Sequence, residues 1–269
     1  MIAEPGALAS VLLVAAVYLR GVRAVWTRAG QGHGVREWQA ACFAAGLLVT
    51  LAALETPLDS LSEALFAAHM VQHLLLMLVA APLLALGAPL IALAWGLPPD
   101  VRRGTARLCR LLPTRPSVAF TLHVVAIWAW HIPSLYEAAL SNRAIHAAEH
   151  ASFLATGALF WWVVVRRGYG LGVLYVFGLA VQSTILGALL TFARAPWYTS
   201  HLSSTAAWGL TALEDQQLAG VIMWVPGGLI YLVAALSLFG VWLSAGAGPA
   251  PTRSTPARRP AEPLASPEP

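Results

Sequence analysis

The chain has 269 residues, of which 58% are hydrophobic and only 10% are charged, and its mean hydropathy is +0.70. A soluble domain is usually about 25% charged, so this composition excludes an ordinary water-soluble globule, a disordered chain and a collagen-like fibre. A polytopic membrane protein remains, and at about 20 residues per span the length accommodates roughly seven spans.

Seven apolar segments follow one another and predict an all-α, seven-helix transmembrane bundle. They lie at about 5–25, 38–55, 63–86, 117–136, 144–165, 170–193 and 217–243. The first segment has no basic residue before Arg20, which is not typical of a signal peptide. Pro82 and Pro226 fall inside the third and seventh segments and predict a kinked or loosened helix at each.

The basic residues are all arginines, and they separate the loops into two classes. Fourteen of the sixteen lie between spans 1 and 2, between spans 3 and 4, between spans 5 and 6, or in the C-terminal tail. Only Arg143 and Arg194 fall on the other side. Since cytoplasmic loops of membrane proteins are enriched in arginine, we expect the N-terminus outside and the C-terminus in the cytoplasm.

We expect one transmembrane domain over residues 1–245 and a tail over 246–269. The tail has 7 prolines in 24 residues, which predicts a disordered cytoplasmic segment. The two cysteines, Cys42 and Cys109, form no CxxC pair, so neither a disulfide framework nor a thiolate zinc site is indicated.

Histidines are concentrated in the apolar segments, where ionisable side chains are costly and usually functional. His69 and His73 are four residues apart in the third segment, and His146 and His150 are four apart in the fifth. Side chains four apart lie on one helical face. At 1.5 Å per residue, these four histidines and His131 share the outer half of the membrane.

These histidines are candidate metal ligands, because neutral imidazole suits copper, zinc and iron. His201 lies above them in an outer loop, whereas His123 is nearer the inner side and on a different helical face. The acidic and amide residues close to the cluster are candidate ligands or orienting partners, namely Glu149, Asp215 and Gln216.

The intramembrane histidines also have a structural explanation that requires no metal. A single intramembrane histidine is more often held by an interhelical hydrogen bond than by a metal, which applies to His123 and His131. Met77 continues the His69–His73 row and is either a packing residue or a thioether ligand that favours Cu(I).

Three blocks of sequence resemble the CtaG-type cytochrome c oxidase assembly factor family of multi-span membrane proteins. The blocks are His69-Met70-Val71-Gln72-His73 followed by 81–89, His146-Ala147-Ala148-Glu149-His150 followed by Trp161-Trp162, and 215–220 followed by 223–228. They span about residues 60–230.

The resemblance implies a non-enzymatic, chaperone-like protein of the plasma membrane that helps to mature a haem-copper oxidase by delivering copper. The implied partners are an oxidase subunit and membrane lipid, with no nucleic acid. The site residues that match the family blocks are His69, His73, His146, His150 and Asp215, and His131 joins them because of its depth. We therefore expect Cu(I) at these six residues.

Three other functions are kept open. Two of the histidines are candidate axial ligands for haem, as in a cytochrome b-like electron carrier or a haem-handling protein. A scaffold that holds an oxidase intermediate would use its histidines only for packing. A metal-dependent hydrolase ranks last because the sequence contains no HExxH motif.

Overall fold

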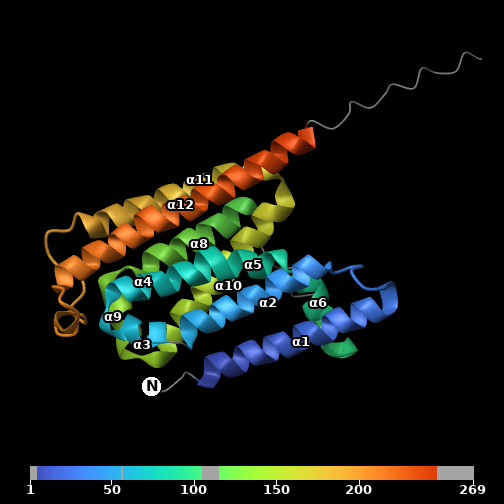
Figure 1. Ribbon diagram of the computed structural model, residues 1–269, viewed down its shortest axis with the longest axis horizontal. Coiled ribbons are helices and arrows are strands. Elements are labelled where there is room, and N and C mark those ends of the chain that lie inside the picture. The colour runs from blue at the N-terminus through green and yellow to red at the C-terminus, as the bar shows by residue number, and fades with distance from the viewer. Residues whose placement is uncertain (1–4, 56, 105–114, 247–269) are drawn as a thin grey trace, which may run out of the picture.

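The structure, a computed structural model, describes residues 5–55, 57–104 and 115–246. The described residues are helical with short connections and contain no β-strand, which confirms the all-α fold (Figure 1). The elements, in chain order, are α1 (Pro5–Ala29), α2 (Glu37–Leu54), α3 (Pro57–Ala64), α4 (Phe66–Leu74), the π-helix η1 (Leu75–Ala80), α5 (Ala81–Leu86), α6 (Pro89–Gly96), α8 (Pro116–Trp130), α9 (Pro133–Ser141), α10 (Arg143–Arg167), α11 (Tyr169–Thr191), the 3-10 helix η2 (Thr205–Trp208) and α12 (Ala212–Gly246).

The number of spans agrees with the sequence. Six helical runs of the described residues are long and apolar enough to cross a membrane, and the number is seven when the bent pair α8–α9 is counted as one span. The protein is therefore a multi-pass membrane protein. The sidedness of the arginine-rich loops stays a prediction, and the proposed tail at 246–269 lies, after Gly246, outside the described residues.

The third span runs through the middle of the bundle as α4, η1 and α5 (Figure 1). It is the most buried of the spans. The predicted disturbance at Pro82 takes the form of the π-helix η1, which immediately precedes α5. Proline lacks an N–H and its ring crowds the carbonyl four residues earlier, at Leu78, so a wider turn at this point relieves the clash.

The fourth span is broken, which corrects the continuous helix expected over 117–136. Its two parts, α8 and α9, meet at an angle of 75°. The cause is Pro133, which begins α9 and forces Ile132 into an extended conformation with φ −66° and ψ 125°. His131 therefore caps the end of α8 at the bend.

Two hydrophobic cores hold the bundle together. The larger one surrounds α4 and contains side chains from α8 to α12, whereas the smaller one joins α1, α2 and α6. Within the smaller core α1 and α6 approach very closely, since a Cβ at Gly21 would lie 1.7 Å from the carbonyl oxygen of Ala92. In Figure 1, α1 lies at one edge of the molecule and the α11–α12 pair lies at the other.

Candidate metal centre

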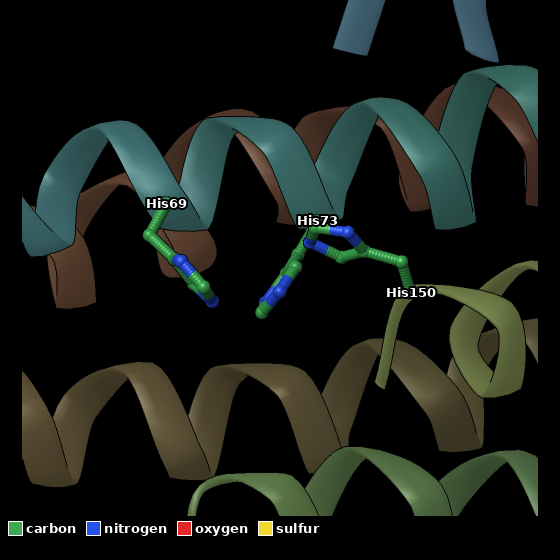
Figure 2. A group of neighbouring side chains, drawn as sticks. All are labelled: His69, His73 and His150. Carbon is green, nitrogen blue, oxygen red and sulfur yellow. The ribbon is translucent and has the colours of Figure 1, made fainter. Parts of the chain in front are cut away.

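The candidate centre lies between α4 and α10. His69 and His73 are one turn apart on α4, and His146 and His150 are one turn apart on α10. Figure 2 shows His69 and His73 projecting from α4 while His150 reaches toward them from α10. The two sequence pairs therefore converge, as their spacing and depth suggest.

The ligand atoms form two overlapping groups of three. One nitrogen from each of His69, His73 and His150 lies within 4.8 Å of the other two. A second group with the same limit contains His69, His146 and Glu149. His69 is therefore common to both groups.

Glu149 lies between the two histidines of α4. Its carboxylate oxygens are 3.7 Å from Nε2 of His69 and 3.6 Å from Nε2 of His73, which is too long for a hydrogen bond. Neither oxygen has a hydrogen-bond partner, and the side chain is fully buried. A buried carboxylate without a partner is unfavourable, so this position favours a bound proton or a cation.

The imidazoles also have unused hydrogen-bonding capacity. Both ring nitrogens of His69 and His73, and Nε2 of His146 and of His150, have no partner among the described residues. Buried polar groups in proteins are nearly always paired. A cluster in which several nitrogens and a carboxylate converge unpaired is therefore typical of a ligand site rather than of packing.

Burial differs among the four histidines. His69, His73 and His150 are buried, whereas His146 is only partly buried and lies near the start of α10. His146 is thus the least buried of the four histidines, whereas Glu149 in the same group is fully buried.

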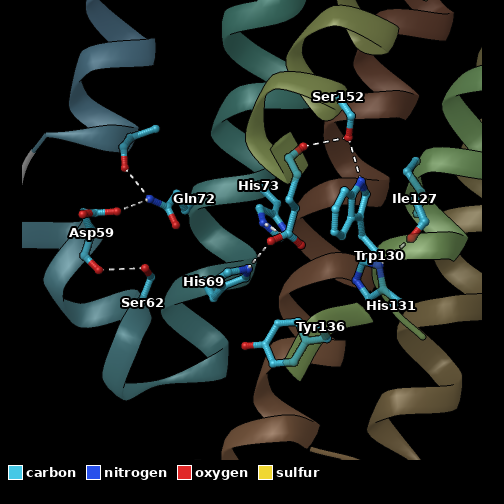
Figure 3. A network of polar contacts seen from close by, with 12 residues as sticks. Asp59, Ser62, His69, Gln72, His73, Ile127, Trp130, His131, Tyr136 and Ser152 are labelled. Atoms are coloured by element: carbon cyan, nitrogen blue, oxygen red, sulfur yellow. Dashed lines mark hydrogen bonds and ion pairs between the residues drawn. The ribbon is translucent and has the colours of Figure 1, made fainter. Parts of the chain in front are cut away.

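Two aromatic side chains that were not predicted from the sequence, Tyr136 and Phe153, form a wall beside the histidines. Tyr136 of α9 packs edge-on against His69 with ring centroids 5.2 Å apart, and Phe153 contacts His73 at 4.6 Å. The Tyr136 hydroxyl is 2.7 Å from Nε2 of His201. Figure 3 shows the ring of Tyr136 next to His69.

His201 belongs to the loop between α11 and α12, which covers this wall. The loop is held by Glu137, whose carboxylate accepts the backbone N–H groups of Thr199 and Ser200, and by Tyr198, whose hydroxyl donates to the carbonyl of His131. Burial lowers the pKa of His201 below its ordinary value, although Asp215 opposes this shift. His201 is therefore held neutral, as a hydrogen-bonding partner of Tyr136.

Asp215 lies outside both three-ligand groups. Its two oxygens accept the backbone N–H groups of Phe66 and Ala67 at 2.7 and 3.0 Å. These are the first residues of α4, so the carboxylate caps the helix that carries His69 and His73. The geometry supports a positioning role for Asp215 and gives no support to a ligand role.

His131 and His123 are also outside the two groups. Nδ1 of His131 is 2.7 Å from the carbonyl oxygen of Ile127, and Nδ1 of His123 is 2.8 Å from the Thr156 hydroxyl. A ligand role for His131 therefore stays a prediction, because His131 interacts electrostatically with His69 and His73 but belongs to neither group, and His123 is likewise outside both groups. Met77 is buried in the larger core.

Comparison with known proteins gives one family and two relatives. The family model described as "Cytochrome c oxidase caa3 assembly factor" matches residues 16–245. Two uncharacterized proteins, from Mycobacterium bovis and Mycobacterium tuberculosis, are 26% identical over 200 residues. The match covers 67% of this chain but only 30% of each relative, so the chain spans less than a third of their length. No solved structure matches.

Proposed function

Because the chain belongs to the cytochrome c oxidase caa3 assembly factor family, we propose that it binds Cu(I) at the α4–α10 histidine cluster and delivers it to an oxidase subunit. The observation that supports this most directly is the set of His69, His73 and His150, whose unpaired nitrogens lie within 4.8 Å of one another. Three imidazoles at this separation can surround one small ion.

The charge of the site favours a monovalent ion. Imidazole is neutral when it binds a metal, so Glu149 is the group in the two three-residue sets that can supply a negative charge. A single positive charge would be cancelled by this carboxylate, whereas a divalent ion would leave a net charge inside the membrane at a high desolvation cost. This argument supports Cu(I) over Zn²⁺ or Cu²⁺.

The two overlapping groups support transfer rather than storage. The ion is first bound by His146, Glu149 and His69, the group with the least buried histidine, and then by His69, His73 and His150. Each step exchanges imidazoles and keeps His69 as a common ligand. A site of this kind loads and unloads more readily than a closed thiolate cage, and it needs no catalytic residue.

The crowding of the histidine rings does not favour haem. The ring centroids of His69, His73, His146 and His150 are 4.2 to 6.1 Å apart, and Tyr136 and Phe153 pack against them. A bis-histidine haem needs two imidazoles on opposite faces of a wide planar macrocycle, and this packing leaves little room for one. A single ion needs only convergent ligand atoms, and three nitrogens of this cluster lie within 4.8 Å of one another.

The test is anaerobic Cu(I) loading of the detergent-purified protein, with metal analysis, an optical spectrum and competition against a colorimetric Cu(I) chelator. We expect about one copper per chain, and a loss of affinity of more than a hundredfold when His73 and His150 are both changed to Ala. His123→Ala is the matched control, since His123 is an equally buried membrane histidine outside both groups.

Oxidase assembly in cells completes the test. The double variant should fail to restore oxidase activity to a strain that lacks this protein, whereas His123→Ala should restore it. Haem absorption bands without copper would replace the proposal with a haem function. Normal assembly by a variant that binds no metal would leave a scaffold as the function.

A further inference from the structure

One backbone carbonyl in the third span has no donor from its own helix. At the end of η1 the N–H of Ala81 donates to the carbonyl of Leu76, five residues earlier. In the same register the carbonyl of Met77 would accept the N–H of the next residue, but that residue is Pro82, which has none. A carbonyl without a donor is costly inside a membrane. The third span therefore needs a donor from another helix at Met77.

Trp161 of α10 supplies this donor. Its indole N–H donates to the Met77 carbonyl at 3.1 Å, and both residues are buried. The indole nitrogen of the adjacent residue, Trp162, has no hydrogen-bond partner among the described residues. Of these two neighbouring tryptophans, Trp161 is therefore the one that replaces the N–H that Pro82 lacks.

The π-turn determines which face of the third span meets α10. Ala81 is twelve residues after His69, and in a regular α-helix this spacing would leave the two side chains about 120° apart. A π-turn contains one more residue than an α-turn, and one residue corresponds to about 100° of rotation. The turn at η1 therefore returns Ala81 to within about 20° of the face that carries His69.

The contacts with α10 agree with this alignment. The rings of His73 and His150 have centroids 5.4 Å apart. Beyond η1, a Cβ at Gly157 of α10 would lie 3.2 Å from the Cβ of Ala81, so α5 also packs closely on α10. The histidines and Ala81 thus meet one helix, which a straight α-helix with these faces about 120° apart would not allow.

We propose that Trp161 is a positioning residue for the histidine cluster. Its N–H stabilises the π-turn, and the π-turn keeps His69 and His73 on the face toward α10. Trp161 is eleven residues after His150, about 16 Å along the helix, so it acts through the backbone of the third span. The inference rests on the proposed copper function, since it concerns the same ligands.

The first experiment compares Trp161→Phe with Trp162→Phe. Each variant loses an indole N–H and keeps an aromatic ring, but only Trp161→Phe loses the hydrogen bond to Met77. Cu(I) affinity is measured by chelator competition on the full chain in detergent, well below the unfolding temperature. We expect Trp161→Phe to bind about tenfold more weakly and Trp162→Phe to bind as the unmodified protein does.

A role in stability alone gives a different result. It would lower the unfolding temperature of Trp161→Phe and leave the Cu(I) affinity of the folded protein unchanged, which would overturn the proposal. A benzothiophene side chain at position 161, which has the shape of indole without the N–H, isolates the hydrogen bond and keeps the packing. We expect the same loss of affinity as in Trp161→Phe, and an affinity equal to that of the unmodified protein would also overturn the proposal.

Amide hydrogen exchange of residues 75–81 tests the π-turn without copper. In the metal-free protein, exchange should be faster in Trp161→Phe than in Trp162→Phe. Because coupling between two sites is reciprocal, Cu(I) loading of the unmodified protein should slow this exchange. If the unmodified protein binds no copper, the proposed function fails. If exchange in metal-free Trp161→Phe is unchanged, the positioning role of Trp161 fails by itself.

Discussion

Two helix interfaces in this protein are built in opposite ways. Between α11 and α12 the backbones approach closely through small residues, since a Cβ at Gly220 would lie 2.5 Å from the carbonyl oxygen of Gly187. Between α4 and α10 the interface instead contains four histidines and a glutamate with unpaired polar atoms. The first interface leaves no buried side-chain polar atom of the described residues unpaired, whereas the second leaves several unpaired.

The difference indicates where the protein is structural and where it is functional. Small-residue packing gains van der Waals contacts and leaves no polar group unsatisfied. Unpaired polar atoms at the α4–α10 interface cost stability, and the proposed ion would offset that cost. The predictions below test this contrast, beginning with the largest expected effect.

Copper should stabilise the α4–α10 interface strongly. At a free Cu(I) concentration a thousandfold above the dissociation constant, the free energy of unfolding should rise by about 4 kcal/mol. The variant with both His73→Leu and His150→Leu should lose this response and should be more stable than the unmodified protein without metal, because unpaired polar atoms are removed. Thermal unfolding with and without Cu(I) measures both effects. A copper response retained by the double variant would contradict the assignment of the ligands.

Gly220→Ala should disrupt the α11–α12 interface. The added methyl group meets backbone atoms of Gly187 and Thr191, which cannot move aside as a flexible side chain can. We expect a loss of about 1–3 kcal/mol in the free energy of unfolding. Gly228→Ala is the control, because a Cβ at Gly228 in the same helix meets nothing within 4 Å. Equal unfolding temperatures for the two variants would show that close packing at Gly220 is unimportant.

Asp215→Ala should affect the metal site through the position of α4. The loss of the two backbone hydrogen bonds at Phe66 and Ala67 should cost about 1 kcal/mol, as for other N-terminal caps. Cu(I) affinity should fall by less than it does on loss of His73, and Asp215→Asn, which keeps one acceptor oxygen, should restore part of it. A loss as large as that of His73→Ala would instead make Asp215 a direct ligand.

The smallest expected effect is the pH dependence of the stability of the loop between α11 and α12, which contains His201. Burial lowers the pKa of His201 in the folded protein, with Asp215 and Glu137 opposing. An opened loop therefore binds a proton more readily, and the stability of the closed loop should fall as the pH drops below about 6.5. Hydrogen exchange of residues 196–209 at pH 7.5 and 5.5 measures this. His201→Gln should flatten the dependence, and an unchanged dependence would assign it to another group.

The predictions from the sequence agree best with the structure for features that depend on residues close together in one helix. The spacing of four residues placed each histidine pair on one face, and the arithmetic of helical rise placed the pairs at one depth. The break at Pro133 was missed because a hydropathy pattern does not register the conformation that a proline imposes on Ile132. Tyr136 was missed for the same reason, since only the bend brings α9 beside His69.

The capping role of Asp215 could not be predicted from its residue type and its depth in the membrane. Its carboxylate is close to the N-terminal end of the third span, as expected, but its oxygens accept hydrogen bonds from the N-terminus of α4. Two backbone N–H groups compete with a metal for the same acceptor atoms, and the sequence does not contain that contact because 149 residues separate Phe66 from Asp215.

The sequence by itself determined the membrane class, the number of spans and the histidine pairs, because these depend on composition and on the period of one helix. The tertiary structure decided which pairs meet, since the choice of neighbouring helices depends on packing between distant segments. It also placed Glu149 between His69 and His73 and left their polar atoms unpaired. That placement makes the cluster a candidate ligand site rather than a packed core.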